Sequence, residues 1–187
     1  MKLPIIAYGD PVLRKKAVEI TKNYPNLEEL IANMFETMYY ANGVGIAAPQ
    51  IGISIRLFVI DLTDKEDPEL KDFKKVFINA QILSEEGDKW DFNEGCLSIP
   101  EIREDISRNQ TVTLSYYDEN WNQYTETFSG FKARVIQHEY DHIEGKLFTD
   151  KLSPLRRAML KSRLDSISRG TIKVDYRMKF PAASKKR

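Results

Sequence analysis

The stretch QHEYDH contains both histidines of the 187-residue chain, His138 and His142, on either side of Glu139. On an α-helix, residues four positions apart lie one turn apart on the same face, so both imidazoles can point at one metal ion. This requires a helix whose histidine face points inward, toward further ligands. Glu139 is placed to reach a water molecule beside such an ion, as in the HExxH motif of zinc hydrolases. Ordinary helices also contain HExxH by chance, but the lack of any other histidine favours the metal interpretation.

Two histidines do not complete a metal site, and spacing alone leaves the third protein ligand open. The extended HExxHxxGxxH signature would require a third histidine where this chain has Phe148. A thermolysin-like site would require a downstream glutamate, but none follows Glu144. Three downstream aspartates remain candidates: Asp150, Asp165 and Asp175.

The chain's only cysteine, Cys96 in EGCLSIP, is the other candidate for the third ligand. Two imidazoles, one thiolate and one water make an open four-coordinate site for a first-row metal. A lone cysteine is more often a small buried hydrophobic residue. The neighbouring Gly95 weakens that interpretation, because glycine allows the unusual backbone geometry that a close approach requires.

Composition limits the class of protein. One cysteine excludes an internal disulfide framework and fits a reducing compartment. A net charge of zero gives the molecule as a whole no attraction to nucleic acid, so sequence-specific nucleic-acid binding is not expected. No segment approaches the ~18 apolar residues of a membrane span, and the N-terminus lacks the apolar core of a signal peptide. We therefore expect one soluble, cytoplasmic domain over residues 1–187, without a membrane partner.

Basic residues gather at the C-terminal end, where residues 152–187 form an extension of that domain. From Arg156 onward there are eleven Lys or Arg residues and two Asp, a balance of +9, so the preceding residues carry −9. A solvated helical tail explains this pattern without a partner. The alternative is a docking element for something anionic.

Hydrophobic periodicity predicts a helix over residues 27–41, opened by a capping box between Asn26 and Glu29. A second helix, over residues 130–144, carries the HExxH motif and follows a capping residue at Ser129.

A third helix is predicted between Ser153-Pro154 and Gly170, because proline is favoured in the first turn and glycine just past the end. The residues expected on its buried side are Leu155, Met159, Leu164 and Ile167.

Strands are expected at residues 55–60, 75–83, 111–117, 121–128 and 172–180, and the third and fourth form a β-hairpin. These elements lack the regular βαβ rhythm of a parallel sheet, so we expect an α+β fold.

Three segments resemble the motifs of peptide deformylases. GVGIAAPQ from Gly43 is similar to their GxGxAAxQ motif, EGCLS from Glu94 to their EGCLS motif, and QHEYDH from Gln137 to their QHExDH motif. The motifs follow the family's order, and the opening YGDPVL also resembles the family's N-terminus. On these motifs, about residues 1–152 are identified as similar to the family.

The resemblance implies antiparallel sheets around a central HExxH helix. Beyond residue 152, the C-terminal helix and the possible tail strand rest on the residue patterns alone. It implies an enzyme that removes the formyl group from the N-terminal formylmethionine of nascent polypeptides and releases formate. Cys96, His138 and His142 would hold one divalent metal ion. The family characteristically uses Fe(II), and such a site also accepts Zn(II), Ni(II) or Co(II).

By resemblance, Glu139 transfers the proton of the attacking water to the leaving nitrogen. The Gln50 side chain and the backbone N–H of Leu97 would bind the oxyanion. Docking on the ribosome through the basic C-terminal segment is also implied. The residues expected to line the peptide groove are Val44, Gly45, Ile46 and Gly95.

Two other functions use the same residues. One is a metallopeptidase or aminoacylase-type amide hydrolase with the same metal site. The other is a non-catalytic metal-binding module, which would need a fourth protein ligand that the sequence does not reveal.

Overall fold

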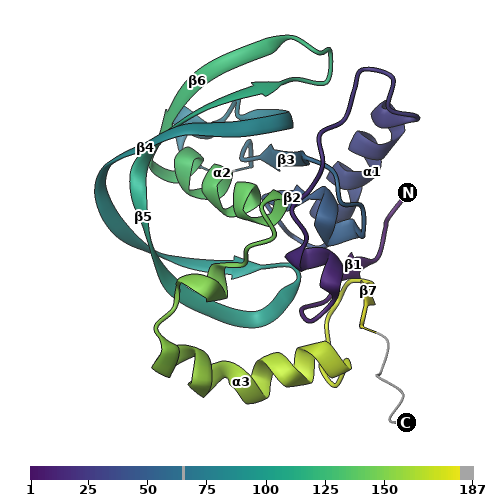
Figure 1. The fold of residues 1–187 in the computed structure, drawn as a ribbon, viewed down its shortest axis with the longest axis vertical. Coiled ribbons are helices and arrows are strands. Elements are labelled where there is room, and N and C mark those ends of the chain that lie inside the picture. The colour runs from purple at the N-terminus through teal and green to yellow at the C-terminus, as the bar shows by residue number, and fades with distance from the viewer. Residues whose placement is uncertain (65, 182–187) are drawn as a thin grey trace.

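The computed structural model describes residues 1–64 and 66–181. At its centre, α2 (Gly130–Ile143) lies in the hollow of a curved five-stranded antiparallel sheet (Figure 1). This confirms the α+β class and the position expected for the HExxH helix. In spatial order the strands are β2 (Gly45–Ala47), β3 (Leu57–Asp61), β4 (Lys74–Cys96), β5 (Ile99–Tyr117) and β6 (Gln123–Ser129).

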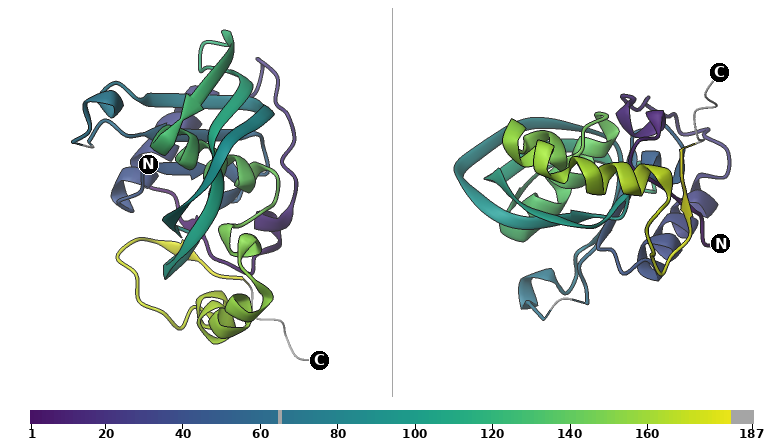
Figure 2. Two further views of the ribbon diagram at one scale, coloured as in Figure 1. Left: turned by 90° about the vertical axis from the view of Figure 1, so that its left-hand side faces the viewer. Right: turned by 90° about the horizontal axis from the view of Figure 1, so that it is seen from below.

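Two helices lie outside the sheet, α1 (Leu27–Tyr40) beside β2 and β3, and α3 (Pro154–Arg169) beneath the end of β5 (Figures 1 and 2). None of the helices in residues 1–64 and 66–181 is long and apolar enough to cross a membrane. Short 3-10 helices occupy Pro11–Arg14, Ala48–Ile51, Pro68–Leu70 and Phe148–Lys151.

Strands β4 and β5 form one long hairpin of 23 and 19 residues that curves around α2 (Figure 1). Four register shifts interrupt their pairing, and such bulges let a strand pair bend. The strand predicted over residues 75–83 is therefore far too short. The polar residues that follow it are held in the strand by pairing with β5, which local hydrophobicity does not reveal. The shorter β5–β6 hairpin is confirmed, with Tyr117 opposite Gln123.

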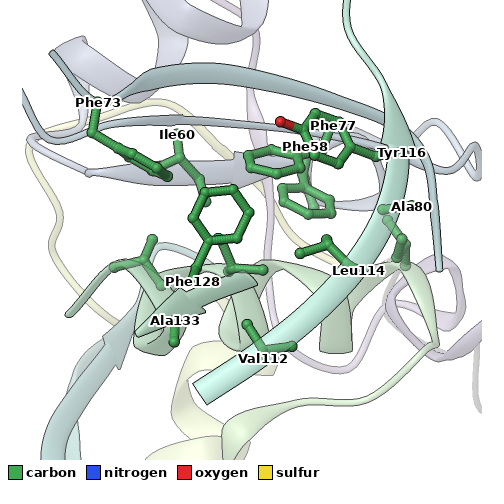
Figure 3. Close-up of a cluster of buried hydrophobic side chains, with 14 of the residues drawn as sticks. Phe58, Ile60, Phe73, Phe77, Ala80, Val112, Leu114, Tyr116, Phe128 and Ala133 are labelled. Carbon is green, nitrogen blue, oxygen red and sulfur yellow. The ribbon is translucent and has the colours of Figure 1, made fainter. Parts of the chain in front are cut away.

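An aromatic cluster fills the space between α2 and the sheet (Figure 3). Phe77 lies at its centre, stacked on Phe58 with ring centroids 4.7 Å apart and 4.5 Å from Tyr116. Helix α2 contributes Ala133 and Ile136, both fully buried. These contacts orient α2, so the opposite face of the helix is directed toward the ends of β2 and β4.

The start of α1 differs from the prediction. The helix begins after Asn26, but Asn26 adopts a φ of 53° and its side chain makes no capping hydrogen bond. A capping box needs extended backbone at this residue, and the left-handed conformation precludes it. The predicted end is accurate, since α1 stops at Tyr40 and Asn42 turns the chain with a φ of 55°.

Helix α3 has its predicted ends but a different buried face. Ser153 accepts a hydrogen bond from the Arg156 amide, and Gly170 ends the helix with a φ of 70°. Leu155 and Met159, expected in the core, are 73% and 63% exposed. The buried stripe consists of Leu160, Leu164 and Ile167, which also have helical spacing and face the β4–β5 hairpin.

Most of the predicted tail strand is not a strand. Only β7 (Met178–Lys179) is paired, and it runs parallel to β1 (Ile5–Ile6). This two-stranded parallel sheet lies apart from the expected antiparallel sheet around α2. The alternation is real, because even-numbered side chains from residue 172 to 180 are half-buried and odd-numbered ones are exposed. The basic residues at 185–187 lie outside the described residues.

Replacing Phe77 with alanine should lower the free energy of unfolding by about 3–5 kcal/mol, because it leaves a cavity among buried rings. Chemical denaturation of Phe77→Ala and Leu83→Ala measures this. Leu83 is 59% exposed, so its replacement should change stability by no more than about 0.5 kcal/mol. Equal effects of the two substitutions would contradict the assigned core.

Candidate active site

Three predicted ligands converge where α2 meets the end of β4. The ligand atoms of Cys96, His138 and His142 all lie within 4.8 Å of one another, and Cys96 Sγ is 3.4 Å from His142 Nε2. The cysteine is the last residue of β4, just before the hairpin reverses at Leu97-Ser98. One thiol sulfur and two imidazole nitrogens, from residues far apart in sequence, therefore form one compact group of possible metal ligands.

The three candidate aspartates lie elsewhere. Asp150 accepts hydrogen bonds from Arg14 and from the Leu147 amide. Asp165 pairs with Lys161 one turn earlier on α3. Asp175 borders the cavity beside the site but is not part of the ligand group.

A buried charge network holds His138 in place. Its Nδ1 lies 2.9 Å from Glu94 Oε2, which leaves Nε2 for a metal. Arg108 Nε and Nη2 donate to the same carboxylate at 2.6 and 3.0 Å, and Arg134 Nη1 donates at 2.8 Å. Arg108 Nη1 also donates to Asp141 at 2.7 Å. Sheet and helix are thus joined by the carboxylate that orients one ligand.

The environment shifts the pKa values of Glu94 and of the two histidines. Burial raises the pKa of Glu94, but hydrogen bonds with His138 and Arg108 outweigh burial and hold it well below its usual range. Burial lowers the pKa of His138, but hydrogen bonds to Cys96 and Glu94 outweigh it and raise the pKa. For His142, burial and the neighbouring His138 together lower the pKa well below its ordinary value.

Sequence reasoning missed Arg108 and Arg134 and gave Glu94 and Asp141 no role. A signal for Arg108 exists in β5, where inward-facing residues alternate with exposed ones and Arg108 falls in step with Ile102 and Ile106. A charged residue in step with the buried face of a strand needs a buried partner.

Glu139 lies on the same helix with its carboxylate buried next to Gly45. Among the described residues, its Oε2 has no hydrogen-bond partner. Burial raises its pKa to about 7. A Cβ atom on Gly45 would lie 2.5 Å from Glu139 Oε1, so only glycine leaves room for this carboxylate.

Gln50 and Leu97 complete the inner wall of the site. Gln50 Oε1 accepts from the Ala47 amide, while its Nε2 lies 3.5 Å from Cys96 Sγ and 3.3 Å from Ser98 Oγ. The amide side chain therefore braces its own turn and also directs its N–H₂ group toward the ligand set. Leu97 forms the hairpin reversal directly after the cysteine.

A cavity of about 730 Å³ opens onto these residues. Val44, Gly45 and Gly95 line it, as does Val135 one turn before His138. Ile46 does not, because its side chain is fully buried in the core between β2 and α1. The cavity is bordered by the edge strand of the sheet on one side and the β4–β5 reversal on the other.

The donor set fits a divalent transition metal. One thiolate and two imidazoles suit such ions, and the Glu94 carboxylate gives His138 the outer support that is usual for a metal-ligating imidazole. No fourth protein ligand joins the group among the described residues, which is the pattern of an open rather than a closed site.

Comparison with known proteins agrees with this geometry. The family model described as polypeptide deformylase matches residues 2–158. The chain belongs to the polypeptide deformylase family. Its activity is hydrolysis of the N-formyl group of formylmethionyl polypeptides, and the enzyme is a metal-dependent hydrolase.

Individual deformylases cover nearly the whole chain. A peptide deformylase of Christiangramia forsetii is 59% identical, and the match covers 100% of both chains. One of Flavobacterium psychrophilum is 57% identical over 96% of this chain and 97% of the other. The crystal structure of a peptide deformylase from Legionella pneumophila has a TM-score of 0.80 at 40% identity, covering 91% of this chain and 98% of that chain.

Replacing Gly45 of this deformylase with alanine should reduce kcat on the order of 100-fold, because the added methyl group displaces the Glu139 carboxylate. Steady-state formate release measures this, with metal content and thermal stability recorded in parallel. Ile46→Val is the control in the same strand, since it removes one methyl group without approaching Glu139. Near-normal kcat in Gly45→Ala would show that the carboxylate position is not critical.

Proposed function

We propose that Cys96, His138 and His142 hold the divalent metal ion and that Glu139 is the general base of deformylation. The observation that supports this most directly is the buried Glu139 carboxylate, which faces the cavity beside the three ligand atoms. A pKa near neutrality suits a group that must first accept and then release a proton.

The chain's own residues supply the steps of hydrolysis. The bound ion contributes positive charge that makes a water molecule more acidic and stabilises negative charge on oxygen. Glu139 accepts a proton from the water whose oxygen attacks the formyl carbon. It then gives the proton to the nitrogen as the C–N bond breaks, which yields formate and a free amino group. Gln50 Nε2 and the Leu97 amide donate hydrogen bonds to the formyl oxygen, which becomes negatively charged during the attack.

The groove is suited to an extended peptide. Strand β2 is the edge of the five-stranded sheet, and its glycine-containing start borders the cavity. A peptide added beside it gains main-chain hydrogen bonds that do not depend on its side chains. Val44, Gly45 and Gly95 contribute this backbone surface, and Val135 lies on the apolar part of the wall, where a methionine side chain would fit.

We infer from the resemblance to deformylases that the ion is Fe(II). Zn(II), Ni(II) and Co(II) are possible substitutes, because a thiolate–imidazole site accepts all four. Affinity rises from iron to nickel, so the metal available in the cell determines which ion is bound. A cytoplasmic location fits a chain whose one cysteine serves as a ligand and must remain reduced.

Glu139→Gln should retain the metal and lose nearly all formate release, because the ligands stay while the base is removed. Cys96→Ser is the matched contrast. It should lose the metal as well, because a neutral hydroxyl replaces a thiolate. Metal analysis and formate release from formyl-Met peptides measure both.

Near-wild-type turnover in metal-loaded Glu139→Gln would refute Glu139 as the base, and unchanged metal affinity in Cys96→Ser would refute Cys96 as a ligand. Cleavage of unformylated peptides in place of formate release would favour the metallopeptidase alternative.

We also propose that α3 docks the enzyme on the ribosome. Leu155 and Met159 form an exposed apolar pair on this helix. Three basic residues of the same helix, Arg157, Lys161 and Arg169, are also exposed. Such a surface suits a site that combines RNA phosphates with apolar groups, and phosphate contacts would make binding weaken steeply with salt.

Reversing the charge of Arg157, Lys161 and Arg169 to glutamate should abolish salt-sensitive co-sedimentation with ribosomes. The buried stripe of α3 stays intact in this variant, unlike in a truncation. Reversal of three exposed lysines elsewhere, Lys22, Lys71 and Lys89, gives the same net charge and should sediment like the wild type. Equal losses in both variants would mean that net charge alone, rather than α3, controls binding.

A further inference from the structure

The chain beyond α3 turns back onto the catalytic cavity. Gly170 ends the helix, and the following loop returns toward β1 (Figure 2). On this path Lys173, Val174, Asp175 and Tyr176 line the same cavity as Cys96 and His138. These residues lie outside the part of the chain, residues 2–158, that the family model matches.

Backbone pairing fixes the far end of this loop. The Ile5 amide donates to the Arg177 carbonyl and the Ala7 amide to the Lys179 carbonyl, both at 2.9 Å. Phe180 packs against Gly170, where a Cβ atom would lie only 3.0 Å from the ring. The two ends of the loop are therefore held together, and residues 173–176 have a defined place at the cavity.

A side-chain hydrogen bond joins the loop to the catalytic turn. The Tyr176 hydroxyl donates to the Leu97 carbonyl at 2.8 Å, and both side chains pack in the same apolar cluster. From the other side, the Tyr8 amide donates to the Ser98 carbonyl at 2.9 Å. Both carbonyls of the Leu97-Ser98 reversal are thus held, one of them by the loop.

The part of the loop that borders the cavity contains residues of opposite charge, Lys173 and Asp175. Both are exposed, and they alternate along the chain with the half-buried Val174 and Tyr176. The formyl group must reach the ligand set, so the peptide that follows the formylated methionine extends away from it through the remaining cavity. Residues 173–176 form one border of that space.

We propose that residues 173–176 are a binding subsite for the peptide residues that follow formylmethionine, with Lys173 and Asp175 selecting among charged side chains. The inference rests on the deformylase function described above. The ligand is an extended peptide, and Tyr176 anchors the subsite to the catalytic turn.

The test compares kcat/KM for formyl-Met-Ala-Lys and formyl-Met-Ala-Glu peptides in the metal-loaded enzyme. Asp175→Lys should shift the ratio toward the Glu peptide, and Lys173→Glu should shift it toward the Lys peptide. Each shift should be about two- to fivefold at low salt, the size expected for a partly exposed ion pair, and smaller at high salt. A ratio of two substrates cancels any general loss of active enzyme.

Two matched controls carry the same charge changes away from the cavity, Asp88→Lys and Lys71→Glu. Both residues are exposed, and these variants should keep the wild-type ratio. Binding of the deformylated Met-Ala-Lys and Met-Ala-Glu products, measured by calorimetry, should shift in the same directions as kcat/KM.

The outcomes separate the two levels of inference. Tail variants with the same substrate ratio as their controls, in an enzyme that does release formate, would overturn the subsite alone. An enzyme that releases no formate from either peptide would instead overturn the function on which the subsite rests.

Discussion

The rest of the structure depends on the buried carboxylate of Glu94. It lies at the end of the long strand β4 and pairs with Arg108 on β5, with Arg134 and with the ligand His138 on α2. Asp141 pairs with Arg108 and supplies a second negative charge for the two buried arginines. Because removing one partner leaves an uncompensated buried charge, replacing a single member of such a network destabilises the folded state by about 3–5 kcal/mol. The same pairing that docks the helix in the sheet also sets the orientation of a ligand.

This arrangement explains why the site combines a helix motif with a strand end. The HExxH face of α2 brings two candidate metal ligands and the proposed base, so a third ligand has to come from the sheet that surrounds the helix. Cys96 meets that requirement because the β4–β5 hairpin reverses immediately after it. Gly45 on the neighbouring edge strand leaves the space for the base. Ligand set and base therefore depend on the packing of the aromatic core behind α2.

Local patterns were enough to predict the helix positions, the short hairpin and the α+β class. The donor chemistry also made Cys96 a candidate, and it lies with the two histidines. Long-range effects account for what was missed. The second half of β4 is polar and is a strand only because β5 pairs with it, and Arg108 is buried only because Glu94 faces it. The exposed Leu155 and the left-handed Asn26 show where tertiary packing and backbone conformation override periodicity and capping preference.

The pairing of β1 with β7 joins residues 5–6 to residues 178–179, nearly the whole length of the described chain. The entropy cost of closing a loop grows only slowly with loop length, so the large sequence separation adds little to the free-energy cost of this contact. The β1–β7 pairing nevertheless forms late. Residues 5–6 cannot pair until residues 178–179 have been synthesised, and contacts of such high sequence separation form slowly. During synthesis, α2 and the candidate metal ligands are therefore made before residues 173–176, so the border that this loop gives the cavity is added after the rest of the cavity wall.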